Sequence, residues 1–234
     1  MKMKSPFLLF AGVALFAAAL GSPSRLIADP APGEAAVSQW NLENFEAGRV
    51  PNAVAGGPEL TIDSEEAVPE LIKDESLNGL RFDHGEALTG KSSQIAALQG
   101  ADPSGKAFGV RVTLLPTTRP AGAYGGLFQA MVYKESGFRI VVTEGLKVAV
   151  EIFDGVEHHG LNSQSTLALD QPCKVEVRFE EDMARLYIND NLEAEKPGIY
   201  PAPFDGNMMI GKASGKDYFF RGIIKDVTIF TFTP

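Results

Sequence analysis

Apolar and polar residues alternate with a period of two along the middle of the chain. Over 108–114 (FGVRVTL) every second residue is apolar, and a similar alternation runs over 127–134 (LFQAMVYK). Side chains on an extended strand point to opposite faces in turn, so each segment has one apolar face that can enter a core. The pattern predicts two half-buried β-strands.

Turn sequences divide the following residues into short segments of the same kind. Gly stands beside polar residues at 135–137, 144–145 and 154–155, which favours tight turns and predicts strands at 138–143 and 147–153. With 127–134, these strands predict an antiparallel meander. A second hairpin is predicted from 174–179 and 184–188, and a last strand within 223–232. The only helix-like segment is 65–75, which Pro69 interrupts.

The N-terminus has the pattern of a signal peptide over residues 1–28. Lys2 and Lys4 precede an unbroken stretch of apolar and small residues at 7–20. That stretch is shorter than the roughly 20 residues of a membrane-spanning helix. Cleavage is predicted after Ala28, with Gly21 as the alternative, so the chain is expected to be secreted or periplasmic without a stable membrane anchor.

Composition narrows the classes of fold and partner. Residues 29–37 are rich in Pro and Ala and predict a linker, which leaves one domain over 38–234. Cys173 is the only cysteine, so no intramolecular disulfide can form, and a lone buried cysteine is usually a small hydrophobe. The net charge of −9 and the lack of a Lys/Arg-rich run argue against nucleic acid as a partner.

Three motifs occur in an order that resembles the laminin-G-like branch of the concanavalin A-like lectin/glucanase superfamily. They are GLRFDHG at 79–85, the hairpin KVEVRF at 174–179 with LYIND at 186–190, and GIIKDVTIF at 222–230. The resemblance covers residues 39–234. It implies an all-β fold, a two-sheet antiparallel β-sandwich of the concanavalin A-like jelly-roll type. It also implies a glycan- or protein-binding module, often with calcium at its rim, although some members are glycoside hydrolases or lyases.

The sequence predicts no catalytic residues. Glucanases of this superfamily carry Glu-x-Asp-x-x-Glu on one strand, whereas Glu151 and Asp154 are three residues apart here. A period of two sends these two carboxylates to opposite faces, and Asp154 with Gly155 is typical of a turn. His158 and His159 are adjacent and point apart for the same reason, which argues against a shared metal ion.

The outward face of the meander is the candidate ligand-binding surface. If its apolar residues enter the core, the opposite face carries Gln129, Met131, Tyr133, Arg139, Thr143, Lys147, Glu151 and Phe153. Rings cover the apolar faces of sugars and polar groups reach their hydroxyls. The candidate ligand-binding residues are therefore Gln129, Tyr133, Arg139, Glu151 and Phe153. The alternative is that a second layer or a loop covers this face.

Calcium is the one cofactor that the sequence leaves open. Such a site needs several oxygen ligands, and Asp63 and Asp226 are the candidate metal ligands. Asp83 and Asp154 are better explained as residues that cap their own turns.

The function predicted from these observations is that of an exported, non-catalytic module that binds a glycan or an extracellular or periplasmic protein. One alternative is a carbohydrate-active enzyme on the same fold, with carboxylates contributed by different strands. The other is a purely structural module of an exported assembly.

Overall fold

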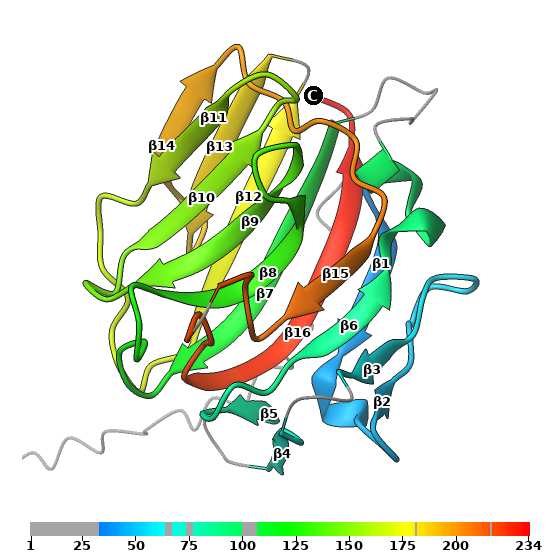
Figure 1. Ribbon diagram of the computed structural model, residues 1–234, viewed down its shortest axis with the longest axis vertical. Coiled ribbons are helices and arrows are strands. Elements are labelled where there is room, and N and C mark those ends of the chain that lie inside the picture. The colour runs from blue at the N-terminus through cyan, green and yellow to red at the C-terminus, as the bar shows by residue number, and fades with distance from the viewer. Residues whose placement is uncertain (1–32, 64–66, 74–76, 100–106, 181, 216) are drawn as a thin grey trace, which may run out of the picture.

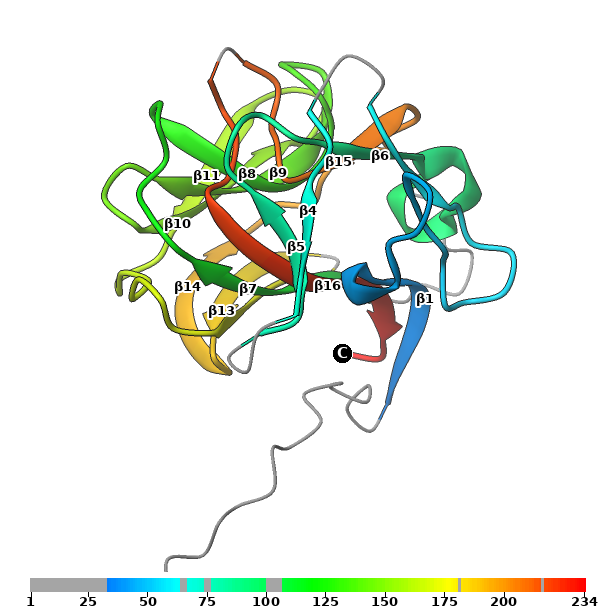
Figure 2. The same cartoon turned by 90° about the horizontal axis from the view of Figure 1, so that it is seen from below.

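The computed structural model describes residues 33–63, 67–73, 77–99, 107–180, 182–215 and 217–234. These residues form two antiparallel sheets that pack face to face (Figure 1). Figure 2 shows the sheets as two curved layers. The predicted all-β, two-sheet antiparallel sandwich is confirmed.

Sheet B, in front in Figure 1, has the strand order β11-β10-β9-β8-β15-β6-β3-β2. Its strands are His158–Asn162 (β11), Val148–Phe153 (β10), Ser136–Thr143 (β9), Tyr124–Val132 (β8), Asn207–Ile210 (β15), Leu88–Lys91 (β6), Leu60–Ile62 (β3) and Arg49–Val50 (β2). The predicted meander is confirmed as β8, β9 and β10, and β11 extends it by one strand that the sequence pattern did not predict.

Sheet A lies behind, with the order β14-β13-β12-β7-β16-β5-β4 and with β1 also paired to β16. Its strands are Asn191–Pro197 (β14), Met183–Ile188 (β13), Cys173–Glu180 (β12), Ala107–Pro116 (β7), Gly222–Phe232 (β16), Gly79–Phe82 (β5), Glu70–Ile72 (β4) and Glu34–Asn41 (β1). The predicted β12–β13 hairpin and the predicted last strand are both confirmed. Several connections cross between the sheets, among them 117–123, 163–172, 198–206 and 211–221.

Aromatic rings from both sheets meet in the core. The ring of Phe138 in β9 lies 4.7 Å from that of Phe179 in β12 and 5.6 Å from that of Phe128 in β8. Phe108 of β7 lies 5.0 Å from Phe179, and all four side chains are buried. Each belongs to the apolar face that the alternation of apolar and polar residues predicts. The packing of the rings and the sequence pattern therefore favour the same strand register.

Two predictions for the first third of the chain are wrong. Glu70–Ile72 is a strand, β4, which pairs with β5, so this part of the helix-like segment 65–75 is extended. The helical turns are instead the 3₁₀ segments Leu42–Asn44, Ser92–Gln94 and Ala96–Gln99. Residues 34–37, predicted as linker, belong to β1 because they pair with β16. The predicted signal peptide, residues 1–28, lies outside the described residues.

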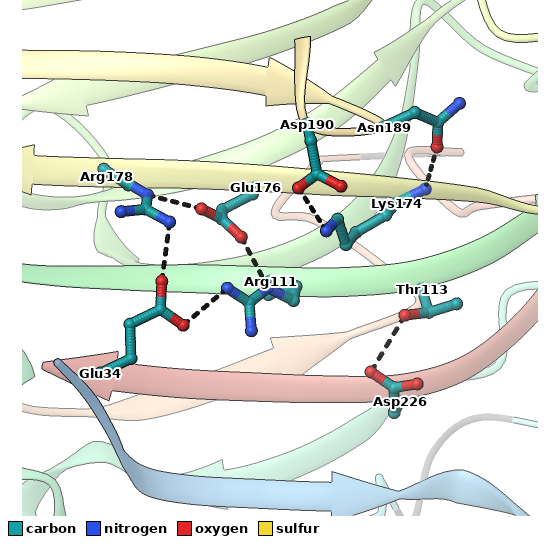
Figure 3. A network of polar contacts seen from close by, with 9 residues as sticks. All are labelled: Glu34, Arg111, Thr113, Lys174, Glu176, Arg178, Asn189, Asp190 and Asp226. Carbon is teal, nitrogen blue, oxygen red and sulfur yellow. Dashed lines mark hydrogen bonds and ion pairs between the residues drawn. The ribbon is translucent and has the colours of Figure 1, made fainter. Parts of the chain in front are cut away.

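Two arginines and two glutamates form a closed ring of ion pairs on the outer face of sheet A (Figure 3). Arg111 of β7 donates to Glu176 at 2.6 Å and to Glu34 at 2.9 Å. Arg178 of β12 donates to the other oxygen of each carboxylate, at 2.5 Å and 2.7 Å. We call these four residues the arginine–glutamate ring. It links β1 to β7 and β12, three strands that are far apart in the sequence.

The arginine–glutamate ring is buried and packs on an aromatic side chain. The side chains of Glu34, Arg111 and Glu176 are 3%, 6% and 4% exposed. The Arg111 guanidinium lies 4.6 Å from the centre of the Phe230 ring. That ring occupies the space over Gly109, where an added Cβ would come within 2.4 Å of it. Burial alone would lower the pKa of Arg111, but the Glu176 and Glu34 carboxylates raise it above its ordinary value.

Replacing Glu176 by Gln is expected to destabilise the protein by about 3 kcal/mol, because the buried Arg111 and the partly exposed Arg178 then share one carboxylate. The measurement is the free energy of unfolding in urea. Glu59→Gln is the matched control: Glu59 pairs with Arg49 at 3.4 Å, with both side chains exposed, so its loss costs about 0 to 1 kcal/mol. Equal effects of the two substitutions would contradict the structural role of the arginine–glutamate ring.

Candidate functional site

The outer face of sheet B carries the predicted ligand-binding residues in cross-strand rows. Gln129 of β8 pairs with Arg139 of β9, and Arg139 pairs with Glu151 of β10. In the next row, Phe153 of β10 pairs with His158 of β11. The predicted orientation is confirmed, since the core cluster takes the intervening residues of these strands.

A connection between the sheets covers the middle of this face. The side-chain amide of Gln129 donates to Ser214 Oγ at 2.6 Å and accepts from the Ser214 amide at 2.7 Å. Gln129 and Arg139 are only 2% and 4% exposed as a result. For these two side chains the alternative prediction, that a loop covers this face, holds, because Ser214 of the 211–221 connection engages their polar groups.

Arg139 holds several elements together. It donates to the Ser214 carbonyl at 3.0 Å, and its Nη2 lies 2.7 Å from the Glu151 carboxylate. Its guanidinium lies 5.6 Å and 5.7 Å from the ring centres of Tyr124 and Tyr218. Arg139 is therefore a positioning residue that fixes both the connection and the Glu151 carboxylate.

The end of the meander, where β8 and β10 enter turns, is open to solvent. Tyr133 is 56% exposed, and its ring meets that of Phe153 edge-on at 5.7 Å. Phe153 is 4% exposed, so the predicted open Phe153 ring is wrong; the neighbouring rings cover it. The His158 imidazole stacks on Phe153 at 4.6 Å and 17°, and its side chain is 51% exposed.

We call Tyr133, Phe153, His158 and Glu151 the aromatic end of sheet B. The Glu151 carboxylate is 13% exposed and lies 3.7 Å from the His158 imidazole. Val132, the last residue of β8, and Val156, in the turn after β10, are also exposed. This end therefore offers an exposed ring, an imidazole and a carboxylate that Arg139 holds in place, which suits a ligand with an apolar face and hydroxyl groups.

Sequence reasoning missed His158 as a member of this site. The feature of the sequence that could have identified His158 is the turn at Asp154 and Gly155. A strand after this turn would pair with β10 and place His158 opposite Phe153. β11 reads HHGLN and lacks a clear alternation, so the pattern did not identify it.

The carboxylates of Glu151 and Asp154 diverge, as predicted. Glu151 faces Arg139, whereas Asp154 Oδ1 accepts hydrogen bonds from the amides of Val156 and Glu157 at 2.8 Å and 2.7 Å. The Glu157 amide is the main cause that lowers the pKa of Asp154 to about 2. His159 contacts Asp154 at 2.8 Å and so points away from His158. This pair of carboxylates does not have the shared-face geometry of a glucanase.

The candidate metal ligands are not brought together with other ligands. Asp63 follows β3 in sheet B, whereas Asp226 lies on β16 in sheet A and accepts from Thr113 Oγ1 at 3.1 Å. Within the described ranges, no three His, Cys, Asp or Glu side chains lie close enough to hold one ion. These residues do not form the carboxylate cluster that favours calcium. Cys173 is buried, which raises its thiol pKa to about 12 and accords with the predicted small hydrophobe.

Solved structures with the same fold include binding domains. The botulinum neurotoxin serotype D binding domain has a TM-score of 0.64 and 11% identity over 85% of this chain and 49% of that one. The botulinum neurotoxin type G receptor binding domain has a TM-score of 0.59 and 11% identity, over 83% of this chain and 47% of that one. Domain 4 of AbnA has a TM-score of 0.64 and 12% identity, over 86% of this chain and 96% of that one. AbnA is an extracellular GH43 arabinanase from Geobacillus stearothermophilus, and the structure of this domain is in complex with arabinotriose.

At these identities the likeness shows the β-sandwich fold alone. The chain spans about half the length of the neurotoxin domains and nearly all of the AbnA domain. No protein-family model matches the chain, and no curated protein matches its sequence. Among the described residues, no helix is long and apolar enough to cross a bilayer.

Replacing Asp226 by Asn is expected to change stability in a pH-dependent way. Burial raises the pKa of Asp226 to about 6 from 3.8, although Thr113 and Lys225 act against the shift. The stability gained by protonating the folded form is complete below about pH 4 and is lost as the pH rises through about 6. At pH 7 the substitution should therefore stabilise the partly exposed site by about 1 to 3 kcal/mol. Asn keeps an acceptor for Thr113, so the two proteins should unfold at similar urea concentrations at pH 4; an equal difference at both pH values would contradict this account.

Proposed function

We propose that the protein is an exported, non-catalytic carbohydrate-binding module whose ligand stacks on the aromatic end of sheet B. The observation that carries this proposal is the Tyr133 ring, which is 56% exposed and braced edge-on against the buried Phe153. A ring held in this way loses little freedom when a ligand stacks on it. It can therefore cover the apolar face of a sugar unit.

The polar groups beside Tyr133 complete the proposed site. The half-exposed His158 imidazole can exchange hydrogen bonds with sugar hydroxyls, and Glu151 can accept them through lone pairs that Arg139 leaves open. Arg139 is already paired with Glu151 and buried. The exposed Lys134 ammonium lies 5.5 Å from the centre of the Tyr133 ring, so a sugar that stacks there shares the ring with this cation or displaces it, and charge does not exclude an acidic sugar.

The comparisons support a carbohydrate as the class of ligand, without indicating which sugar or which residues bind it. Domain 4 of AbnA was crystallised with arabinotriose, and the chain matches nearly all of that domain. A neutral arabinose oligomer is therefore a suitable first probe.

Replacing Tyr133 by Ala is expected to weaken binding of the preferred neutral oligosaccharide at this site about tenfold or more, equivalent to about 1.4 kcal/mol, because stacking is lost. The measurement is a titration with a panel of neutral oligosaccharides that begins with arabinotriose. Binding is followed by calorimetry and by the NMR signal of the His158 imidazole, which reports on this site alone.

Tyr133→Phe is the matched control, since it keeps the ring and should bind within about twofold of the wild type. An unchanged His158 signal with every sugar of the panel would contradict the proposal. So would a Tyr133→Ala variant that retains full affinity at His158.

Export is the second part of the proposal, and residues 1–28 carry it. The Lys-rich start and the short apolar stretch are expected to direct translocation and to be removed after Ala28 or Gly21. Mass spectrometry of the protein from the medium or the periplasm of an expressing bacterium should find an N-terminus at residue 29 or 22. A product confined to the cytoplasm with Met1 intact would contradict export.

A further inference from the structure

A hollow of about 320 Å³ lies at the end of β11 opposite the aromatic end of sheet B. The connection 163–172 forms one wall, and the turn between β13 and β14 forms the other. Its buried apolar lining consists of Leu167, Cys173 and Ile188, and the exposed Ala168 and Pro172 also line it. Its polar lining includes Thr166, Gln171 and Asn191, which are exposed.

Glu193 of β14 holds the wall of the hollow in place. Its carboxylate accepts from the amides of Gln164 and Ser165 at 2.9 Å and 2.8 Å, and from Ser165 Oγ at 2.8 Å. The Ser165 amide is the main cause that lowers the pKa of Glu193. The amides of Leu167 and Asp170 donate to carbonyls of other segments at 2.8 Å each. The hollow is thus formed before any ligand arrives, which reduces the entropy cost of binding.

The polar groups around the hollow define the class of ligand. Among the described residues, no hydrogen bond engages the side chains of Thr166 and Gln171, and the Asn191 amide uses one N–H, at 3.2 Å from the Asn189 carbonyl. These groups offer hydroxyl and amide donors and acceptors above an apolar floor. The single lining carboxylate, Glu193, already accepts three hydrogen bonds, so it is a poor ligand for a metal ion or a cation.

Anions are disfavoured for a related reason. The nearby Lys174 ammonium is paired with Asp190, and no Lys or Arg lines the hollow. A phosphate, sulfate or uronate would find no cation in the lining itself; a further one, the exposed Lys147, acts on Glu193 from outside the lining. A neutral polyhydroxylated ring, with an apolar face for the floor and hydroxyls for the rim, matches what remains.

We propose that this hollow is a second sugar-binding site, which takes one unit of a neutral glycan. The proposal goes beyond the function proposed for the aromatic end of sheet B and uses different residues. Two further exposed apolar side chains, Leu169 and Leu192, belong to the segments that form its walls. His158 and Ser163 are five residues apart along β11 and the start of the connection, a span of roughly 17 Å.

The single cysteine gives a local test of this site. Cys173 lines the hollow, and no other cysteine exists in the chain, so its reaction with a small thiol reagent reports on this place. Because burial raises the pKa of this thiol to about 12, labelling is run at about pH 9, where a small fraction of the reactive thiolate forms. The neutral oligosaccharide panel that begins with arabinotriose is added, and the labelling rate is followed by mass spectrometry. At about ten times its Kd, a sugar in the hollow should slow labelling about tenfold, because only the free protein reacts.

Variants separate this site from the aromatic end. Thr166→Ala with Gln171→Ala should remove the protection, whereas Tyr133→Ala should leave it intact. Asn162→Ala is the matched control, because Asn162 is exposed on β11 outside the hollow and should keep full protection. The labelling rate without sugar and the urea midpoint show whether each variant keeps the hollow folded.

Two results would overturn the second site. One is an unchanged labelling rate with every sugar of the panel. The other is protection that Tyr133→Ala removes and the Thr166/Gln171 double variant retains, because the sugar would then act only through the aromatic end. If protection persists while the His158 NMR signal stays unchanged, the hollow is a sugar site and the aromatic end is not, so the two proposals fail separately.

Discussion

The packing of Phe138 against Phe179 and Phe128 between the two sheets determines which side chains lie on the outer face of sheet B. Side chains alternate along a strand, so placing Phe138 in the core sends Arg139 to the opposite face. Cross-strand register then places Gln129 and Glu151 on either side of Arg139. A register shift of one residue would turn Gln129, Arg139 and Glu151 into the core and would turn the core rings outward. Such a shift is unfavourable because it buries charged groups among apolar side chains. The position of every group at the aromatic end therefore depends on this packing.

Each sheet buries arginine on its outer face by the same combination of contacts. Arg111 packs over Phe230 and shares two carboxylates with Arg178, while Arg139 lies near Tyr124 and Tyr218 and pairs with Glu151. Such buried pairs add little net stability compared with an apolar core, but each charge requires its partner. They fix geometry at the centres of both faces and occupy the groups that a ligand would use. The groups that stay open to solvent lie at the ends, where Tyr133 and the hollow beside Cys173 are found.

The strands were predictable because their signal is local. The sequence left a cover over sheet B open as an alternative, but it did not identify the segment that forms the cover. A period of two identified β7 to β10, β12, β13 and β16, and it also predicted that Glu151 and Asp154 diverge. The cover over Gln129 comes from Ser214, which is 85 residues away in the sequence, and no local pattern relates the two. The ring stack on Phe153 required β11, whose exposed sequence has no clear alternation. β1 and β4 were missed because their place in the sheet comes from pairing with distant strands, β16 and β5, and not from their own composition.

The geometry of β11 relates the two proposed sugar sites to each other. Backbone hydrogen bonds to β10 run along the strand from His158 to Asn162, and the Ser163 amide continues them to Val148. The distance between the two ends is therefore fixed by the sheet and not by a flexible linker. Each site alone is small and presents few polar groups, so a single sugar unit would bind weakly at either. A glycan long enough to reach both would meet the second site at a high effective concentration, and its affinity would exceed that of either contact. Weak sites on a rigid edge would thus select for chain length as well as for sugar chemistry.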